Sequence, residues 1–133
     1  MNELKTFKNY INGQWLDAST LATFEQRNPS MLYEVTGLFP LSSKEDTILA
    51  IEAAQSAFTE WKTLSPFVRA KYLKKVLALM IERREDIAGI ITLENGKIVS
   101  DSLGEIDSAI AEMEFQINEG LRLFGETVPV SID

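Results

Sequence analysis

The chain has 133 residues, 45% of them apolar, and a formal net charge of −7, which allows one domain core but supplies no basic run for nucleic acid. It contains neither cysteine nor histidine, which excludes disulfides, cysteine or serine–histidine catalysis and the usual zinc ligands. No segment approaches the roughly 18 consecutive apolar residues of a membrane-spanning helix, and the opening MNELKTFKNY lacks the apolar core of a secretory signal, so we expect a cytoplasmic protein without a membrane partner.

Residues 1–41 predict two β-hairpins. Asn12 and Gly13 lie between two short apolar runs, and an Asn-Gly pair readily takes the two positive φ angles of a type I′ turn. The second hairpin joins Thr23–Arg27 to Glu34–Pro40 across the turn-forming triplet NPS at residues 28–30. A ligand-binding loop at Asn12 and Gly13 is the alternative to a plain hairpin turn.

Residues 42–125 predict four helices, and the first two have recognisable starts. The first begins at a capping box, formed either by Ser42 with Glu45 or by Ser43 with Asp46. The second begins at Pro66, whose missing N–H costs nothing in the first turn. Apolar residues recur at helical spacing in both helices: Ile48, Ile51, Phe58 and Trp61 in the first, and Tyr72, Leu73, Val76, Leu77 and Met80 in the second.

A short third helix and a long fourth helix follow. The charged cluster Glu82–Asp86 either breaks the preceding helix or forms its solvated end, and Gly96 suits the left-handed position that ends the third helix. The fourth helix is expected over Val99–Phe124, with Gly125 as its cap and residues 126–133 as an extended tail. One apolar stripe follows this helix at spacings of three and four: Leu103, Ile106, Ile110, Met113, Ile117, Leu121 and Phe124. The stripe predicts a long helix lying across other secondary structure, with a coiled coil as the alternative.

Few side chains in these elements point to chemistry. The glycines are spread too widely to form a phosphate-binding loop. Lys97 follows Gly96, and lysine is a residue type that forms Schiff bases with carbonyl substrates. A purely structural role for Lys97 is the alternative. Glu105 and Glu112 lie near one edge of the stripe and suggest a glycosidase-like pair of carboxylates. No aromatic sugar platform lies nearby, which favours the alternative of a solvated helix face.

Four segments, in order along the chain, resemble one known family. They are NYINGQW at residues 9–15, the NPS turn at residues 28–30, TLENGKIVSDSLGE at residues 92–105 and RLFGETVP at residues 122–129. Together they resemble the N-terminal part of the NAD(P)-dependent aldehyde dehydrogenase superfamily. The last segment is most similar to the branch that oxidises semialdehydes, such as succinate or α-ketoglutaric semialdehyde.

The resemblance implies an architecture and a limit on the chemistry. As a stand-alone chain, residues 1–133 are expected to form a single partial domain of the α+β class, with two N-terminal β-hairpins and about four helices. This order resembles the start of the nucleotide-binding domain in the α/β aldehyde dehydrogenase fold. No residue matches the family's nucleophilic cysteine, glutamate base, oxyanion asparagine or cofactor-binding lysine. We therefore expect no catalytic residue and no NAD or NADP binding in this chain, although the full-length family uses one of these cofactors.

Two further roles follow from the resemblance, residue by residue. In family members with a structural monovalent cation, an acidic residue at the position of Glu94 helps to bind the ion, with backbone carbonyls from the segment equivalent to Gln26 and Arg27. A helix-end charge is the alternative role for Glu94. The long helix also borders the family's substrate tunnel, where Gly104 and Ser108 occupy wall positions.

Two functions of different class remain. In the first, the chain is an N-terminal fragment of an aldehyde dehydrogenase, inactive alone, and its partner is the remainder of the enzyme. In the second, it is a non-enzymatic helical module for binding or oligomerisation. Each large apolar side chain left in water forgoes about 1.5–3 kcal/mol. We therefore expect the stripe on the long helix, if nothing in the chain covers it, to drive self-association into a dimer or higher oligomer.

Overall fold

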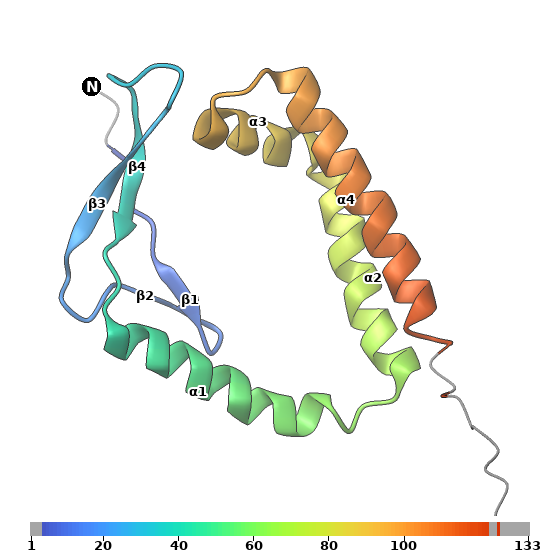
Figure 1. Cartoon of the computed structure of the whole chain (residues 1–133). Helices are drawn as coiled ribbons and strands as arrows, with labels where there is room; N and C mark the ends of the chain where they lie inside the picture. The colour runs from blue at the N-terminus through green and yellow to red at the C-terminus, as the bar shows by residue number, and fades with distance from the viewer. Residues whose placement is uncertain (1–3, 123–124, 126–133) are drawn as a thin grey trace, which may run out of the picture.

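The computed structural model describes residues 4–122 and residue 125, and it has the predicted α+β architecture (Figure 1). Two separate two-stranded antiparallel sheets precede four helices. The elements are β1 (Asn9–Ile11), β2 (Gln14–Leu16), β3 (Thr23–Arg27), β4 (Val35–Pro40), α1 (Lys44–Trp61), α2 (Pro66–Glu82), α3 (Arg84–Asn95) and α4 (Val99–Glu119). The expected tail at residues 126–133 lies outside the described residues. In the described part, no helix combines the length and apolar character needed to cross a membrane.

Both predicted hairpins form. In the β1–β2 turn Asn12 has a φ of 50° and Gly13 a φ of 77°, the two positive angles that the Asn-Gly pair predicts. The second hairpin begins at the predicted residue, and its return strand begins at Val35, one residue later than expected. The segment before β1 lies alongside β4, because the amide of Phe7 donates to the carbonyl oxygen of Leu38 at 2.8 Å.

The start of α1 decides between the two capping boxes. The hydroxyl of Ser43 accepts a hydrogen bond from the amide of Asp46 at 3.2 Å, and the Asp46 carboxylate accepts one from the amide of Ser43 at 2.8 Å. The alternative box at Ser42 is wrong, because the Ser42 hydroxyl accepts instead from the side-chain amide of Asn9 at 2.8 Å. That bond ties the start of α1 to β1.

The next helices begin and end close to where the sequence predicts. α2 starts at Pro66, and the hydroxyl of Ser65 before it accepts from the amide of Val68 at 3.4 Å. The charged cluster contains a break, because the backbone of Arg83 leaves the helical region between α2 and α3, with φ −101° and ψ 20°. Gly96 ends α3 in the left-handed conformation, with a φ of 80°.

α4 differs from the prediction in where it ends and in what covers it. It ends at Glu119 rather than Phe124, because after Gly120 the amides of Leu121 and Arg122 donate to carbonyls three residues earlier and tighten the chain. Phe124 lies outside the described residues. The other members of the stripe are buried or half-buried, and they pack against the neighbouring helices of the same chain. The described part of the stripe is therefore covered within the chain, and the interpretation of a long helix lying across other secondary structure is confirmed. Self-association through the stripe stays a prediction.

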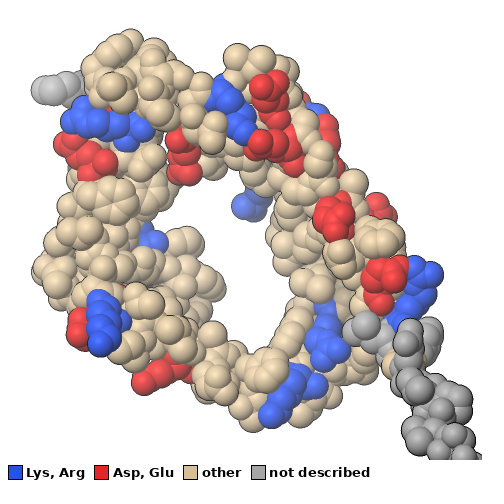
Figure 2. Space-filling view, in the orientation of Figure 1, with Lys and Arg blue, Asp and Glu red and all other residues tan. Residues whose placement is uncertain are grey.

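The elements are arranged as a ring around an open centre (Figures 1 and 2). The hairpins form one side, α1 runs below, α2 and α4 lie side by side opposite the hairpins, and α3 crosses the top. The buried cluster of Ala70, Leu77 and Ile117 lies in the seam between α2 and α4. Among the described residues six apolar side chains are buried, three of them alanines, whereas 26 large apolar side chains are exposed. The hairpins and α1 therefore have almost no core of their own.

Candidate functional site

The ring closes where the β3–β4 turn meets the end of α3. The hydroxyl of Ser30 donates to the carbonyl oxygen of Gly96 at 2.6 Å, across 66 residues of sequence. Within the described part of the chain, no other hydrogen bond joins the hairpins to α2, α3 or α4. A Cβ added at Gly96 would lie 2.7 Å from the Ser30 hydroxyl oxygen and 3.1 Å from Cγ of Pro29, so close approach and positive φ both require glycine here. We call this contact the junction.

Asn28 holds the turn in the shape that brings Ser30 to the junction. Its side-chain oxygen accepts from the amide of Ser30 at 3.0 Å, which is the hydrogen bond of an Asx turn. Its side-chain amide donates to the Glu34 carboxylate at 2.7 Å, and its backbone amide donates to the Glu34 carbonyl at 3.0 Å. Asn28 is 4% exposed, so its polar groups are satisfied inside the turn rather than by solvent.

The residues predicted to bind a monovalent cation lie on the two sides of the junction. Glu94 is exposed and lies two residues before Gly96. On the other side, β3 and β4 contain a bulge after Gln26, at which Thr36 is left outside the register and its hydroxyl donates to the Gln26 carbonyl at 3.1 Å. Such irregularities re-aim backbone groups that a regular strand would pair. The structure thus brings the hairpin and the helix end together, as the cation hypothesis requires.

In the described residues no hydrogen bond or salt bridge joins Glu94 to Gln26 or Arg27. The guanidinium of Arg27 pairs with Glu25 and donates to the carbonyl of Leu32 at 3.0 Å. Glu94 forms no hydrogen bond or salt bridge with another described residue. The described residues also contain no group of three or more acidic side chains placed to hold a metal. The cation site therefore stays a prediction.

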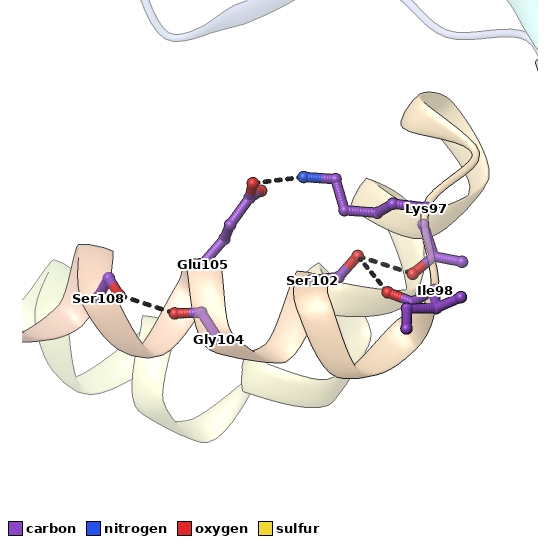
Figure 3. A network of polar contacts seen from close by, with 7 residues as sticks. Lys97, Ile98, Ser102, Gly104, Glu105 and Ser108 are labelled. Carbon is purple, nitrogen blue, oxygen red and sulfur yellow. Dashed lines mark hydrogen bonds and ion pairs between the residues drawn. The ribbon is translucent and has the colours of Figure 1, made fainter.

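Polar contacts hold the start of α4 against the end of α3 (Figure 3). The ammonium of Lys97 pairs with the carboxylate of Glu105. The hydroxyl oxygens of Thr92 and Ser102 lie 2.8 Å apart, and Ser102 is completely buried. Lys97 thus holds α4 against the turn before it, which favours the structural role over a Schiff-base role. Glu105 is likewise paired, which favours the solvated helix face over a pair of catalytic carboxylates.

Gly104 and Ser108, the predicted tunnel-wall residues, share the exposed face of α4. The hydroxyl of Ser108 donates to the carbonyl oxygen of Gly104 at 2.8 Å, one turn earlier (Figure 3). Nothing lies within 4 Å of a Cβ added at Gly104, so no neighbour within the chain requires glycine at this position. This face is available to a partner, and its role as a tunnel wall stays a prediction.

Two aspartates are held in the charged form by their partners. Asp107 accepts from Arg84 through both carboxylate oxygens, at 2.5 and 2.6 Å, and this hydrogen bonding lowers the pKa of Asp107 and raises that of Arg84. Asp46 has a lowered pKa because it accepts from the backbone of Ser43 and also from the amide and hydroxyl of Ser19, which outweighs its partial burial. The contact with Ser19 has no signal in the sequence, because it joins a loop to a helix 27 residues away.

The described residues do not form a cradle for a dinucleotide. Such a cradle uses a parallel strand, a glycine-rich turn and a helix N-terminus. The sheets here are antiparallel hairpins, and the space beside Gly96 is occupied by Ser30 of the same chain.

Comparisons with known proteins agree with this architecture. The malonate-semialdehyde dehydrogenase 1 of Bacillus thuringiensis is 35% identical over 127 residues, which cover 96% of this chain and 26% of that protein. The glutarate-semialdehyde dehydrogenase of Pseudomonas putida is 38% identical over 120 residues, which cover 90% of this chain and 25% of that protein. The crystal structure of succinate-semialdehyde dehydrogenase from Burkholderia pseudomallei matches with a TM-score of 0.87 and 36% identity. The match covers 93% of this chain and 26% of that protein's chain.

The chain spans about a quarter of the length of these relatives. A family model described as the aldehyde dehydrogenase family matches residues 15–133, which is nearly all of the sequence. The fold matches the N-terminal portion of such enzymes. The chain belongs to the aldehyde dehydrogenase family.

Proposed function

We propose that these residues are the N-terminal quarter of an NAD(P)-dependent dehydrogenase that oxidises an aldehyde to a carboxylic acid, and that they act in it as a scaffold without catalytic groups. The observation that carries the proposal is the ring with an uncovered apolar surface. α1 has 18 residues, and the one that is buried is Asp46 rather than an apolar side chain. A helix of this length with its apolar residues in water needs a covering partner.

The chemistry has to come from that partner. Aldehyde oxidation in this family starts with attack by a cysteine thiolate, and the sequence has no cysteine. What the chain supplies is shape: the junction sets where α3 ends, and the pair of Lys97 with Glu105 sets where α4 begins. The exposed face of α4 with Gly104 and Ser108 is then presented to the partner, and we propose it as a wall of the substrate tunnel.

The substrate class is inferred from the relatives. Malonate, glutarate and succinate semialdehydes, which appear in the names of three of them, all carry a carboxylate at the end opposite the aldehyde. We propose an aldehyde of this type for the whole enzyme. The cofactor is inferred in the same way, since matched structures include an NADP-dependent enzyme and an NAD-dependent aldehyde dehydrogenase.

We also propose a monovalent cation at the junction in the whole enzyme, held by Glu94 and the carbonyls of Gln26 and Arg27. The support is the meeting of the hairpin turn and the helix end at Ser30 and Gly96. Replacing Glu94 by Gln should remove any difference in thermal stability between sodium or potassium chloride and a large organic cation. An equal salt response in the two proteins would contradict the role.

Complementation tests the proposed function. The chain would be co-expressed with the glutarate-semialdehyde dehydrogenase of Pseudomonas putida from which the matching quarter has been deleted, and NADH or NADPH formation would be measured with glutarate semialdehyde. We expect activity from the pair and none from either part alone. Reduction of cofactor by the chain alone would overturn the scaffold role. Two folded parts that copurify but remain inactive would also contradict it, and two that do not bind would favour the independent helical module.

A further inference from the structure

The edge of β4 that faces away from β3 is occupied by the segment before β1. The amide of Phe7 donates to the carbonyl oxygen of Leu38 at 2.8 Å, and the amide of Leu38 donates to the carbonyl oxygen of Lys5 at 2.9 Å. Thr6 and Leu38 thereby form a parallel bridge, so residues 5–7 lie along β4 as a short added strand. We call residues 5–7 the strap.

A notch in β4 receives the aromatic ring of the strap. A Cβ added at Gly37 would lie 2.5 Å from the Phe7 ring, so the ring occupies the space that any other side chain at position 37 would fill. The same ring stacks on Phe39, with centroids 4.4 Å apart and an interplanar angle of 9°. The ring of Phe24 in β3 lies 6.1 Å beyond that of Phe39 and extends the aromatic surface. A glycine in a strand often marks such a close approach, and here the notch accepts an aromatic side chain.

Little besides this ring and the two backbone hydrogen bonds attaches the strap to β4. Among the described residues, no side chain of residues 4–7 forms a hydrogen bond or a salt bridge. The ammonium of Lys5 lies 4.7 Å from the centroid of the Phe7 ring, a contact within the strap itself. The next residue, Lys8, pairs with Asp17 at 3.0 Å, but both side chains are half-exposed and such pairs contribute little. The strap can therefore leave β4 at a small cost in free energy.

We propose that the outer edge of β4 and its notch form a binding site for an extended peptide strand with an aromatic side chain, and that the strap is the exchangeable occupant of this site. Backbone hydrogen bonds fix the direction of the strand, as in other cases of strand addition, and the ring supplies the burial. With the strap bound, β4 is paired on both edges, and the strap blocks an edge that would otherwise accept a strand from another molecule. The proposal does not depend on the proposed function.

The backbone amide of Leu38 reports whether the strap is bound. It donates to Lys5 and so faces away from β3, whereas the amide of Phe39 faces β3 by the alternation of an antiparallel ladder. In the wild-type chain, hydrogen exchange corrected for intrinsic rates should be about tenfold or more faster at Leu38 than at Phe39, through local opening. Equal exchange at the two amides, with the same dependence on urea, would overturn the proposal, because the strap would then leave only when the hairpin unfolds.

A free peptide tests the exchange in the full-length chain. Phe7→Ala should raise the exchange rate of the Leu38 amide about tenfold and leave that of Phe39 unchanged. An excess of the acetylated peptide LKTFK should then restore the protection of Leu38, and LKTAK, which lacks the ring, is the matched control. No effect of LKTFK, or an equal effect of the two peptides, would overturn the proposal. Loss of protection at Phe39 in the variant would also overturn it, since the strap would then be required for the hairpin to fold.

Gly37→Ala tests the notch. The added Cβ should release the strap, raise the exchange rate of the Leu38 amide about tenfold, and abolish the rescue by LKTFK in a Phe7→Ala background. Gly89→Ala is the matched control, because it lies in α3 and nothing lies within 4 Å of a Cβ added there. Rescue that persists in the Gly37→Ala/Phe7→Ala chain would show that the peptide binds elsewhere, and the notch would be wrong as the site.

Discussion

Replacing Gly96 by alanine should open the ring at the junction. The residue has a φ of 80°, and a side chain with a Cβ loses about 1–2 kcal/mol in this left-handed region. The new methyl group would also lie 2.7 Å from the Ser30 hydroxyl oxygen, so that side chain must turn away and give up its 2.6 Å hydrogen bond. A hydrogen bond lost in this way costs about 1 kcal/mol. We therefore expect Gly96→Ala to lower the free energy of unfolding by about 2–3 kcal/mol.

Urea unfolding followed by circular dichroism measures this loss, and hydrogen exchange at the backbone amides of Asn28 and Ser30 reports the opening of the turn. Gly104→Ala is the matched control, because nothing lies within 4 Å of a Cβ there and α4 is helical at this point. It should be neutral or stabilise by about 0.5–1 kcal/mol. In a Ser30→Ala background the cost of Gly96→Ala should fall by about 1 kcal/mol, because the hydrogen bond is already absent. A Gly96→Ala chain as stable as the wild type would refute the reasoning.

The other predictions concern the start of α1 and the contact between α3 and α4. Ser43→Ala should lower the free energy of unfolding by about 1 kcal/mol, whereas Ser42→Ala, outside the capping box, should cost less. The lowered pKa of Asp46 means that its contribution to stability is present above pH 3.8 and is lost as the pH falls through the folded-state pKa; Asp46→Asn should flatten this acid limb of stability against pH. Asp107→Asn should flatten the same limb, because Arg84 lowers the pKa of Asp107 in the folded chain, and an unchanged acid limb in both variants would contradict the assignment.

Local features of this fold could be predicted because each depends on residues close together in sequence. The Asn-Gly turn, the capping box and the left-handed glycine all depend on backbone preferences within a few residues. The end of α4 was missed because the apolar spacing continues to Phe124 beyond the break at Gly120. Apolar periodicity reports which face of a helix is apolar, and it does not report where the backbone hydrogen bonds stop.

The candidate site was only partly accessible from sequence. The NPS turn at residues 28–30 and the segment at residues 92–105 entered the family resemblance separately, and in the structure Ser30 of the first and Gly96 of the second form the junction. Their contact spans 66 residues, so no local preference indicates it. The same limit applies to the stripe of α4, because periodicity predicts that an apolar face needs a partner without showing that α2 of the same chain is that partner.

The distribution of burial suggests how the parts of the ring depend on one another. α2 and α4 pack along a common seam, and α3 lies against α4, so the helices on this side contact one another without the hairpins between them. The hairpin side has small sheets, and α1 buries no apolar side chain. The position of α1 therefore depends on the hydrogen bonds from Ser19 to Asp46 and from Asn9 to Ser42, and on the junction. A structure closed by so few contacts has low local stability at the side that lacks a core. The hairpins and α1 should therefore become fully ordered when a partner covers them, whereas the seam between α2 and α4 should be protected from hydrogen exchange in the chain alone.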